Sequence, residues 1–247
     1  MSEFGSNYRG QIPADALDMS VNAGLRSFML GVYNKMGLGL LLTAAIAFAV
    51  GAVAPPEIQR LLLTGPVGLV VMFAPLAILL ISGFMMRNPS PLATNVVYWS
   101  VVSLIGVSFG SIVIRYGARP DGMMIVAKAM LTTAITFGGL SLYGYTTKRD
   151  LSGFGTFLIM ALIGLIVASV LNMFIFKSPM MHTIIAVVGV LIFAALTAFD
   201  TQQLKRTYFA LEGNARALSV ATTQGALSLY LNVVNMFQFL LSLMGSD

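Results

Sequence analysis

The feature that most constrains this chain is a series of hydrophobic segments, each about as long as a lipid bilayer is thick. Roughly 20 apolar residues in a helix rise about 30 Å, which matches the hydrocarbon core of a membrane. Only helices and closed barrels can satisfy every backbone hydrogen bond in that environment. The chain is 57% hydrophobic and only 9% charged, whereas about a quarter of the residues in a soluble domain are charged. We therefore expect an all-α integral membrane protein.

The hydrophobic pattern predicts seven membrane-spanning helices joined by short linkers that contain turn-forming Pro, Gly and Asn residues. The stretch 1–27 is polar and includes acidic residues, unlike a secretory signal, so we interpret it as a cytosolic tail. A single transmembrane domain is expected over residues 28–247. The last linker, near Lys205–Thr223, is expected to be the longest and most polar. The predicted spans are approximately Phe28–Val53, Leu61–Met86, Leu92–Ile114, Met123–Tyr145, Phe154–Phe176, Met181–Gln202 and Ala221–Met244.

The distribution of Lys and Arg predicts the orientation of the chain in the membrane. Most of these residues fall in the tail and in the linkers that share its side, which places the N-terminus in the cytosol and the C-terminus outside. This pattern also accounts for the net charge of +5, so the lipid bilayer, and not nucleic acid, is the expected partner.

The residue inventory argues against several kinds of chemistry. The chain has no Cys and one His, which excludes thiolate and histidine-rich metal sites and a Cys nucleophile. An aspartyl protease within the membrane needs two facing carboxylates, and we place only one acidic residue inside an apolar segment. We therefore expect no catalytic residues, no bound metal, no cofactor and no enzymatic activity.

Asp200 is that acidic residue, near the end of the sixth predicted span. A carboxylate there is costly unless it is paired, hydrogen-bonded or near water. One interpretation is a carboxylate that senses protons or lines an ion pathway. The other is an interfacial acid close to the cytosolic end of its helix, where water reaches it. Arg87 ends the second predicted span at the same depth, which makes it a candidate charge partner.

Polar residues form a stripe along the seventh predicted span. They recur at steps of three or four residues, so they share one face of a helix, which favours a helix inside a bundle with Asp200 beside it. Amides in such positions can also serve simply to join neighbouring helices. The residues of this stripe are Gln224, Ser228, Asn232, Asn235, Gln238 and Ser242.

Three segments of the sequence resemble the signature segments of one membrane protein family. These are LYGYTTKRDLSGFGTFL (Leu142–Leu158), ALTAFDTQQLK (Ala195–Lys205) and GALSLYLNVVNMFQFLL (Gly225–Leu241), and the run Met72–Arg87 is similar to the second span of that family. Their order and the number of spans resemble the Bax-inhibitor-one family, also called the transmembrane Bax inhibitor motif family. The short loops resemble bacterial members, which implies the inner (cytoplasmic) membrane.

The resemblance implies a seven-helix fold whose last helix is central and wrapped by the other six. It also implies a pH-sensitive calcium leak, with calcium as the transported ion. In the family, two acidic residues share hydrogen bonds as the sensor and an Arg in span two acts as a latch. Asp200 matches the first acid and Arg87 the latch, but Asn232 stands where the family usually has the second acid. Our hypothesis is that this departure shifts or removes the pH response, while Ser228, Asn235 and Gln238 line the last helix beside the site.

The family also suggests an alternative function. Some members act as membrane partners that modulate a quality-control protease bound to the membrane, or a cell-death or stress factor. The tail and the Lys205–Thr223 linker would then carry the contacts. A solute transporter ranks last, since the chain shows no inverted repeat and no pair of broken helices.

Overall fold

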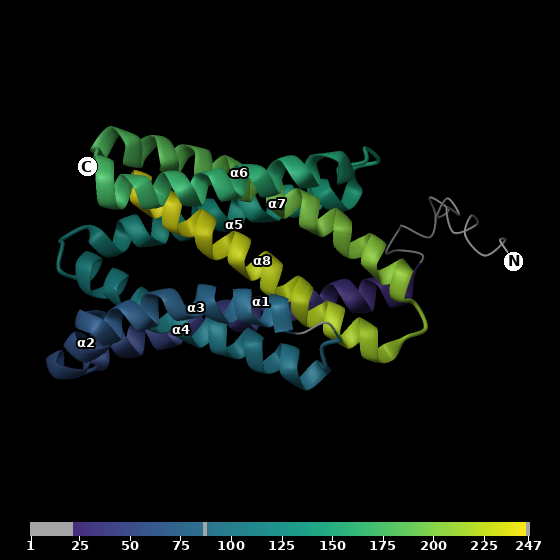
Figure 1. Cartoon of the computed structure of the whole chain (residues 1–247), viewed down its shortest axis with the longest axis horizontal. Helices are drawn as coiled ribbons and strands as arrows, with labels where there is room; N and C mark the ends of the chain where they lie inside the picture. The colour runs from purple at the N-terminus through teal and green to yellow at the C-terminus, as the bar shows by residue number, and fades with distance from the viewer. Residues whose placement is uncertain (1–21, 86–87, 246–247) are drawn as a thin grey trace, which may run out of the picture.

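The computed structural model describes residues 22–85 and 88–245, and every regular element in these ranges is a helix. Figure 1 shows them as a bundle of roughly parallel and antiparallel helices. Arg87 lies outside the described residues. In chain order the elements are α1 (Ala23–Phe48), the π-helical turn η2 (Ala49–Val53), α2 (Pro56–Leu63), α3 (Gly65–Met85), α4 (Pro91–Gly117), α5 (Gly122–Thr146), α6 (Ser152–Leu171), the π-helical turn η3 (Asn172–Phe176), α7 (Pro179–Leu211) and α8 (Ala215–Met244).

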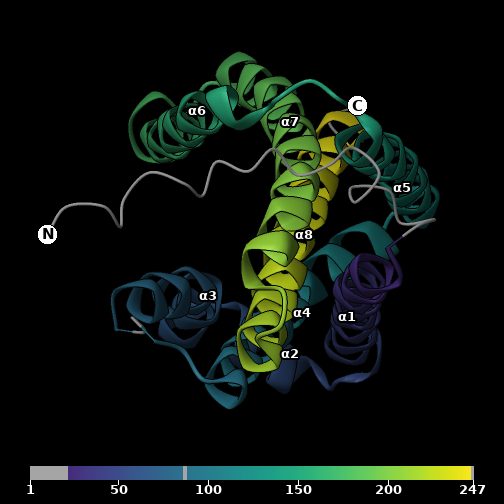
Figure 2. The same cartoon turned by 90° about the vertical axis from the view of Figure 1, so that its right-hand side faces the viewer.

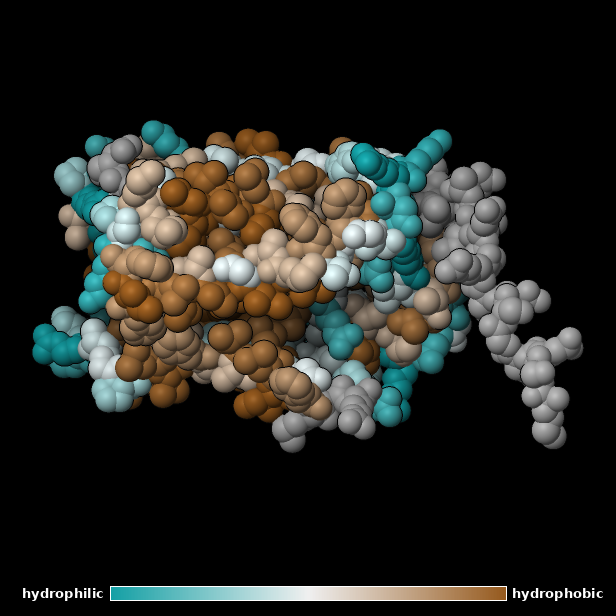
Figure 3. Space-filling model, turned by 45° about the horizontal axis from the view of Figure 1, so that its top comes forward, coloured by the Kyte–Doolittle hydropathy of each residue, from teal (hydrophilic) through white to brown (hydrophobic). Residues whose placement is uncertain are grey.

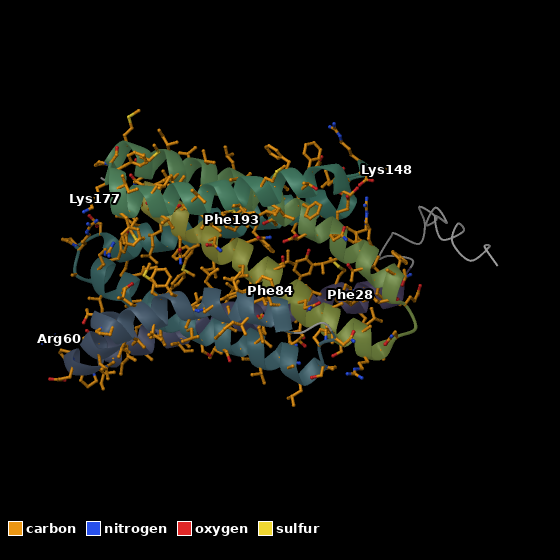
Figure 4. The ribbon with its side chains drawn as sticks, in the orientation of Figure 1. Phe28, Arg60, Phe84, Lys148, Lys177 and Phe193 are labelled. Atoms are coloured by element: carbon orange, nitrogen blue, oxygen red, sulfur yellow. The ribbon has the colours of Figure 1, made fainter. Side chains whose placement is uncertain are left out.

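Seven helices in the described part of the chain are long and apolar enough to cross a membrane, as the sequence predicts. Figure 3 shows a band of hydrophobic residues across the middle of the face turned to the viewer, with hydrophilic residues gathered towards both ends. Charged side chains follow the same division. Lys148 lies at the end where α1 begins, whereas Arg60 and Lys177 lie at the opposite end (Figure 4). A band of this kind is the surface that a bilayer covers.

Local sequence signals set the beginnings of several helices. The Asn22 side chain accepts a hydrogen bond from the backbone N–H of Leu25, which caps α1. Ser90, Ser178 and Asn214 cap α4, α7 and α8 in the same way. Proline occupies the first position of α4 and of α7, where its missing N–H costs nothing.

The last two helices form the centre of the packing. Figure 2 shows α7 and α8 crossing the middle of the bundle, with α1 and α5 on one flank and α3 and α6 on the other. Among the described helices, α1, α4, α5 and α7 pack extensively against α8, whereas α3 packs mainly on α4 and α2, and α6 on α7. Wrapping of α8 by all six other helices is therefore not confirmed.

The core between α1, α4 and α8 contains tyrosines whose hydroxyls are satisfied within the bundle. Tyr98 and Tyr230 are completely buried. The Tyr98 hydroxyl donates to the carbonyl oxygen of Lys35 (2.7 Å), and the hydroxyls of Tyr230 and Thr43 are 2.7 Å apart. Because a buried hydroxyl without a partner is costly, these bonds fix how α1 sits against α4 and α8.

The prediction of a long polar linker at Lys205–Thr223 is wrong. Helix α7 continues to Leu211 and α8 begins at Ala215, so only residues 212–214 connect them, with Gly213 at a φ of 85°. Hydropathy places the ends of an apolar run, but a helix can continue as a polar helix into the interface or solvent when its inner face is still packed. Lys205 and Tyr208 lie on such a buried face.

Two other boundaries differ from the prediction. Helix α1 begins at Ala23, inside the stretch interpreted as a tail. The hydrophobic pattern predicts that the second span begins at Leu61, but Leu61 lies in the short helix α2, and the span itself begins at Gly65. Gly65 has a φ of 64°, a conformation that glycine adopts without strain, so the chain can turn sharply between α2 and α3.

Candidate functional site

Asp200 lies on α7 and is held by two side chains of α8. The Ser228 hydroxyl donates to Asp200 Oδ2 over 2.6 Å, and the Asn232 amide donates to the same oxygen over 2.7 Å. These two donors are four residues apart, so they occupy successive turns on one face of α8. Hydrogen bonds to a charged group contribute about 1.5–3 kcal/mol each, which offsets much of the cost of a carboxylate in this position. Within the described residues, Asp200 Oδ1 has no hydrogen-bond partner.

Asp200 does not lie at the end of its helix. At a rise of about 1.5 Å per residue, it sits roughly 16 Å before Leu211 and roughly 31 Å after Pro179. The carboxylate is partly buried between α7 and α8. Asp200 is therefore not close to the end of its helix, because α7 is longer than its apolar run. The choice between an interfacial acid and a carboxylate in an ion pathway depends on the depth of Asp200 in the bilayer, and it stays open.

The other polar stripe residues of α8 are not part of this hydrogen-bonded group. Asn235 donates to the carbonyl oxygen of Leu231 in its own helix, and Gln238 is exposed. The Ser242 hydroxyl pairs with His182 Nε2 of α7 (2.7 Å), near the opposite end of the bundle. The stripe thus meets α7 at two levels, and the Asp200 level includes only Ser228 and Asn232. The contact proposed for Arg87 remains a prediction.

Two of the family-like segments meet in the loop between α5 and α6. Gln202 Nε2 donates to the carbonyl oxygen of Arg149, and Gln202 Oε1 accepts from the N–H of Leu151, both over 2.8 Å. Arg206 and Asp150 form an ion pair at 2.5 Å. The loop is therefore fastened to α7 between Gln202 and Arg206, within two turns of Asp200.

The ionisation of Asp150 in this loop is expected to depend more on Ser152 than on Arg206. The Ser152 hydroxyl and N–H both donate to Asp150 Oδ1 (2.6 and 2.8 Å), and together with Arg206 they lower the pKa of Asp150 from 3.8 to about 2. A lowered pKa means that this contribution to the folded loop is present above pH 3.8 and is lost as the pH falls through about 2. We predict that Ser152→Ala and Arg206→Gln each raise the pKa of Asp150, as measured by carboxyl-carbon NMR titration, because each removes an interaction that favours the ionised carboxylate. An unchanged pKa in Ser152→Ala would contradict the role of the Ser152 hydroxyl.

Sequence reasoning missed two polar networks near the same end of the bundle. Lys35 Nζ donates to Asn95 Oδ1 (2.6 Å) and to Thr223 Oγ1 (2.7 Å), which joins α1, α4 and α8. The hydroxyl of Ser141 bonds to Tyr33 and to Thr201, the residue after Asp200. A Lys within an apolar segment was the available signal for the first network. The hydroxyl chain has no such signal, since isolated Ser, Thr and Tyr are common in membrane helices. The described residues contain no cluster of His, Cys, Asp or Glu that could hold a metal ion.

The fold and the site together define an integral membrane protein of the polytopic α-helical class, with a carboxylate held between its last two spans. The family model described as "Inhibitor of apoptosis-promoting Bax1" matches residues 25–247. The chain therefore belongs to the Bax-inhibitor-one family, as the three sequence segments suggested.

Bacterial relatives match over nearly their whole length. An uncharacterised protein of Caulobacter vibrioides is 52% identical to this chain, over 100% of the chain and 99% of that protein. The inner membrane protein YbhL of Escherichia coli is 39% identical, over 91% of the chain and 93% of the relative. An uncharacterised protein of Rickettsia prowazekii is 34% identical, over 97% and 98%.

Proposed function

We propose that this protein is a cation leak channel that passes calcium, with the Asp200 carboxylate in the ion path. The observation that carries the proposal is a carboxylate inside a membrane bundle whose Oδ2 is held by Ser228 and Asn232. Ionisable residues in membrane spans are costly and are usually retained for function. Carboxylate oxygens are also preferred ligands of calcium. Both hydrogen bonds go to Oδ2, and no donor among the described residues bonds to Asp200 Oδ1.

The position of the site supports a gate on the cytosolic side. Lys148, Arg149, Arg206 and Arg216 flank the end of the bundle nearer to Asp200, and the positive-inside rule places such residues in the cytosol. We propose that this end faces the cytosol of a bacterium and that the protein resides in the inner membrane. In this orientation the Asp200 carboxylate lies below the cytosolic surface, where a change in cytosolic pH reaches it. Arg87 is the proposed latch, and Asn232 in place of a second acid alters the pH response.

Calcium flux into liposomes tests this function directly. The purified chain is reconstituted around a trapped calcium dye, and flux is measured between pH 6 and 8. We expect Asp200→Asn to lower the flux several-fold, because the neutral amide attracts the cation less than a carboxylate does. Potassium and sodium, measured in the same way, establish which cation passes.

Asp150→Asn is the matched control. It removes one carboxylate from the surface loop near the same end of the bundle, without touching α8. We expect this variant to conduct like the unaltered chain. Equal flux through all three proteins would remove Asp200 from the ion path, and no flux through any of them would refute the channel.

A further inference from the structure

A second site lies on the other flank of α8. A cavity of about 910 Å³ is bordered by α1, α4, α5 and α8, at the level of the π-helical turn η2. Helix α8 contributes Val234 and Phe237 to its wall and Asn232 to the Asp200 site, so one helix borders both. Pockets that hold small ligands usually have volumes of roughly 300–1,000 Å³, so this cavity is large enough for a ligand.

The wall of the cavity offers little to a polar ligand. Its side chains are apolar except for Thr43, Gln59 and Thr133. The hydroxyl of Thr43 pairs with Tyr230, and that of Thr133 donates to the carbonyl oxygen of Ala129, both over 2.7 Å. The Gln59 amide donates to two backbone carbonyls near η2. Because these donors are already used within the protein, the wall favours a hydrocarbon ligand.

The cavity opens sideways, towards the region that the bilayer fills. Ala44 and Phe48 on α1 and Met130 and Ala134 on α5 line it and are exposed. Figure 2 shows α1 and α5 on the same flank of the bundle, with α8 and α4 towards its middle. The entrance therefore lies between two membrane-spanning helices, where the surrounding solvent consists of lipid acyl chains.

Positive charge stands at the end of the cavity away from Asp200. Arg115 is exposed in the last turn of α4, next to the lining residue Ile114. Arg60 is exposed on α2, next to the lining residue Gln59, and α2 packs against α4. Neither arginine lines the cavity itself, and the carboxylates of Glu57 and Asp121 are exposed at the same end. With Arg119, however, the cations at this end outnumber the acids, which favours an acyl chain that is joined to an anionic phosphate.

We propose that the cavity is a binding site for a membrane glycerophospholipid. One acyl chain enters between α1 and α5 and contacts Val234 on α8, while the headgroup phosphate lies at Arg115 and Arg60. This site is independent of the proposed ion path, because it needs neither Asp200 nor conduction.

Photolabelling in vesicles tests the site. The full chain is reconstituted in vesicles that contain phosphatidylglycerol with a diazirine near the end of one acyl chain, and labelled residues are identified by mass spectrometry. We expect label on Met36 and Val234, which line the cavity and are buried from bulk lipid. Label confined to exposed residues of α3 and α6, with none on Met36 or Val234, would overturn the proposal.

Cavity-filling variants provide the second measurement. Ala44→Phe and Ala134→Phe, combined, place two rings in the entrance and should lower the labelling of Val234 several-fold. Ala195→Phe is the matched control, because Ala195 is exposed on α7 and does not line the cavity. Circular dichroism and gel filtration establish whether each variant folds. If a variant does not fold, the positions labelled in the unaltered chain alone test the proposal. Unchanged labelling in a folded double variant would contradict insertion at this entrance.

A separate measurement tests whether Arg115 and Arg60 bind the headgroup phosphate. Arg115→Gln removes about one favourable charge interaction, so we expect competition by unlabelled phosphatidylglycerol to weaken about fivefold. The same label positions should remain, since the acyl chain still fits. An unchanged competition curve for Arg115→Gln and for Arg60→Gln would show that the phosphate does not bind there.

Discussion

Replacing Gly144 by leucine is expected to prevent α5 and α7 from packing and to abolish the folded bundle. A Cβ atom added at Gly144 would lie 2.2 Å from the carbonyl oxygen of Ala198 and 2.9 Å from its Cα. These are backbone atoms of α7, so the clash is relieved only by moving one helix away from the other. Small residues allow such close approach between membrane helices. Even alanine should cost about 1–3 kcal/mol of stability through overpacking, and leucine more.

Gly138, on the same helix, is the matched control. A Cβ atom there would meet nothing within 4 Å. Alanine at Gly138 should leave the stability unchanged or raise it by up to about 1 kcal/mol, since glycine is a poor helix former. Thermal unfolding in detergent micelles, followed by circular dichroism, measures both variants. Equal midpoints for Gly144→Ala and Gly138→Ala would show that α5 and α7 are not in backbone contact at this level.

Asn232→Asp is expected to change the pH response of cation flux strongly. The Asn232 amide is 2.7 Å from Asp200 Oδ2, so the variant would place two carboxylates in direct contact. Two such groups cannot readily both ionise, and they share a proton in a short hydrogen bond. The pair then titrates as a unit, and the pH midpoint of the flux should move by more than about 1 unit from that of the unaltered chain. Liposome flux between pH 5 and 9 measures the shift.

Asn235→Asp separates contact from added charge. Asn235 lies one turn along α8 and donates to the carbonyl oxygen of Leu231, not to Asp200. A carboxylate there adds the same charge without direct contact, so the pH midpoint should change little. If Asn232→Asp left the pH profile as it was, or if Asn235→Asp shifted it as far, the hypothesis that a carboxylate pair at Asp200 controls the pH response would be wrong.

The polar stripe on α8 shows what spacing alone can predict about this site. The recurrence of Ser228, Asn232 and Asn235 at helical intervals predicted a face turned to a neighbouring helix beside Asp200, and the first two do bond to it. Spacing did not reveal that Asn235 turns to its own backbone. A side chain chooses among partners according to local geometry, which a helical period does not specify.

The helix ends were harder to predict for a different reason. The length of an apolar run, such as Met181–Gln202, matches the thickness of the bilayer core and does not indicate where the helix ends. The length of α7 depends on whether the following residues still have a surface to pack on. Lys205 and Tyr208 do, and Gln202 also fastens the loop between α5 and α6. Those contacts of Gln202 join residues about fifty positions apart in the sequence, so local sequence patterns do not predict them.

The sequence by itself determined that this chain crosses a membrane seven times as helices, because an apolar segment in lipid must satisfy its backbone hydrogen bonds internally. It also determined that Asp200 needs a polar partner, because a carboxylate is costly in such a segment. Only the tertiary structure decided which residues of the α8 stripe supply this partner and that Gly144 lets α5 approach the backbone of α7. It alone decided that a cavity remains between α1 and α5. These features depend on the distances between helices, which are set by the shapes of side chains from many segments at once.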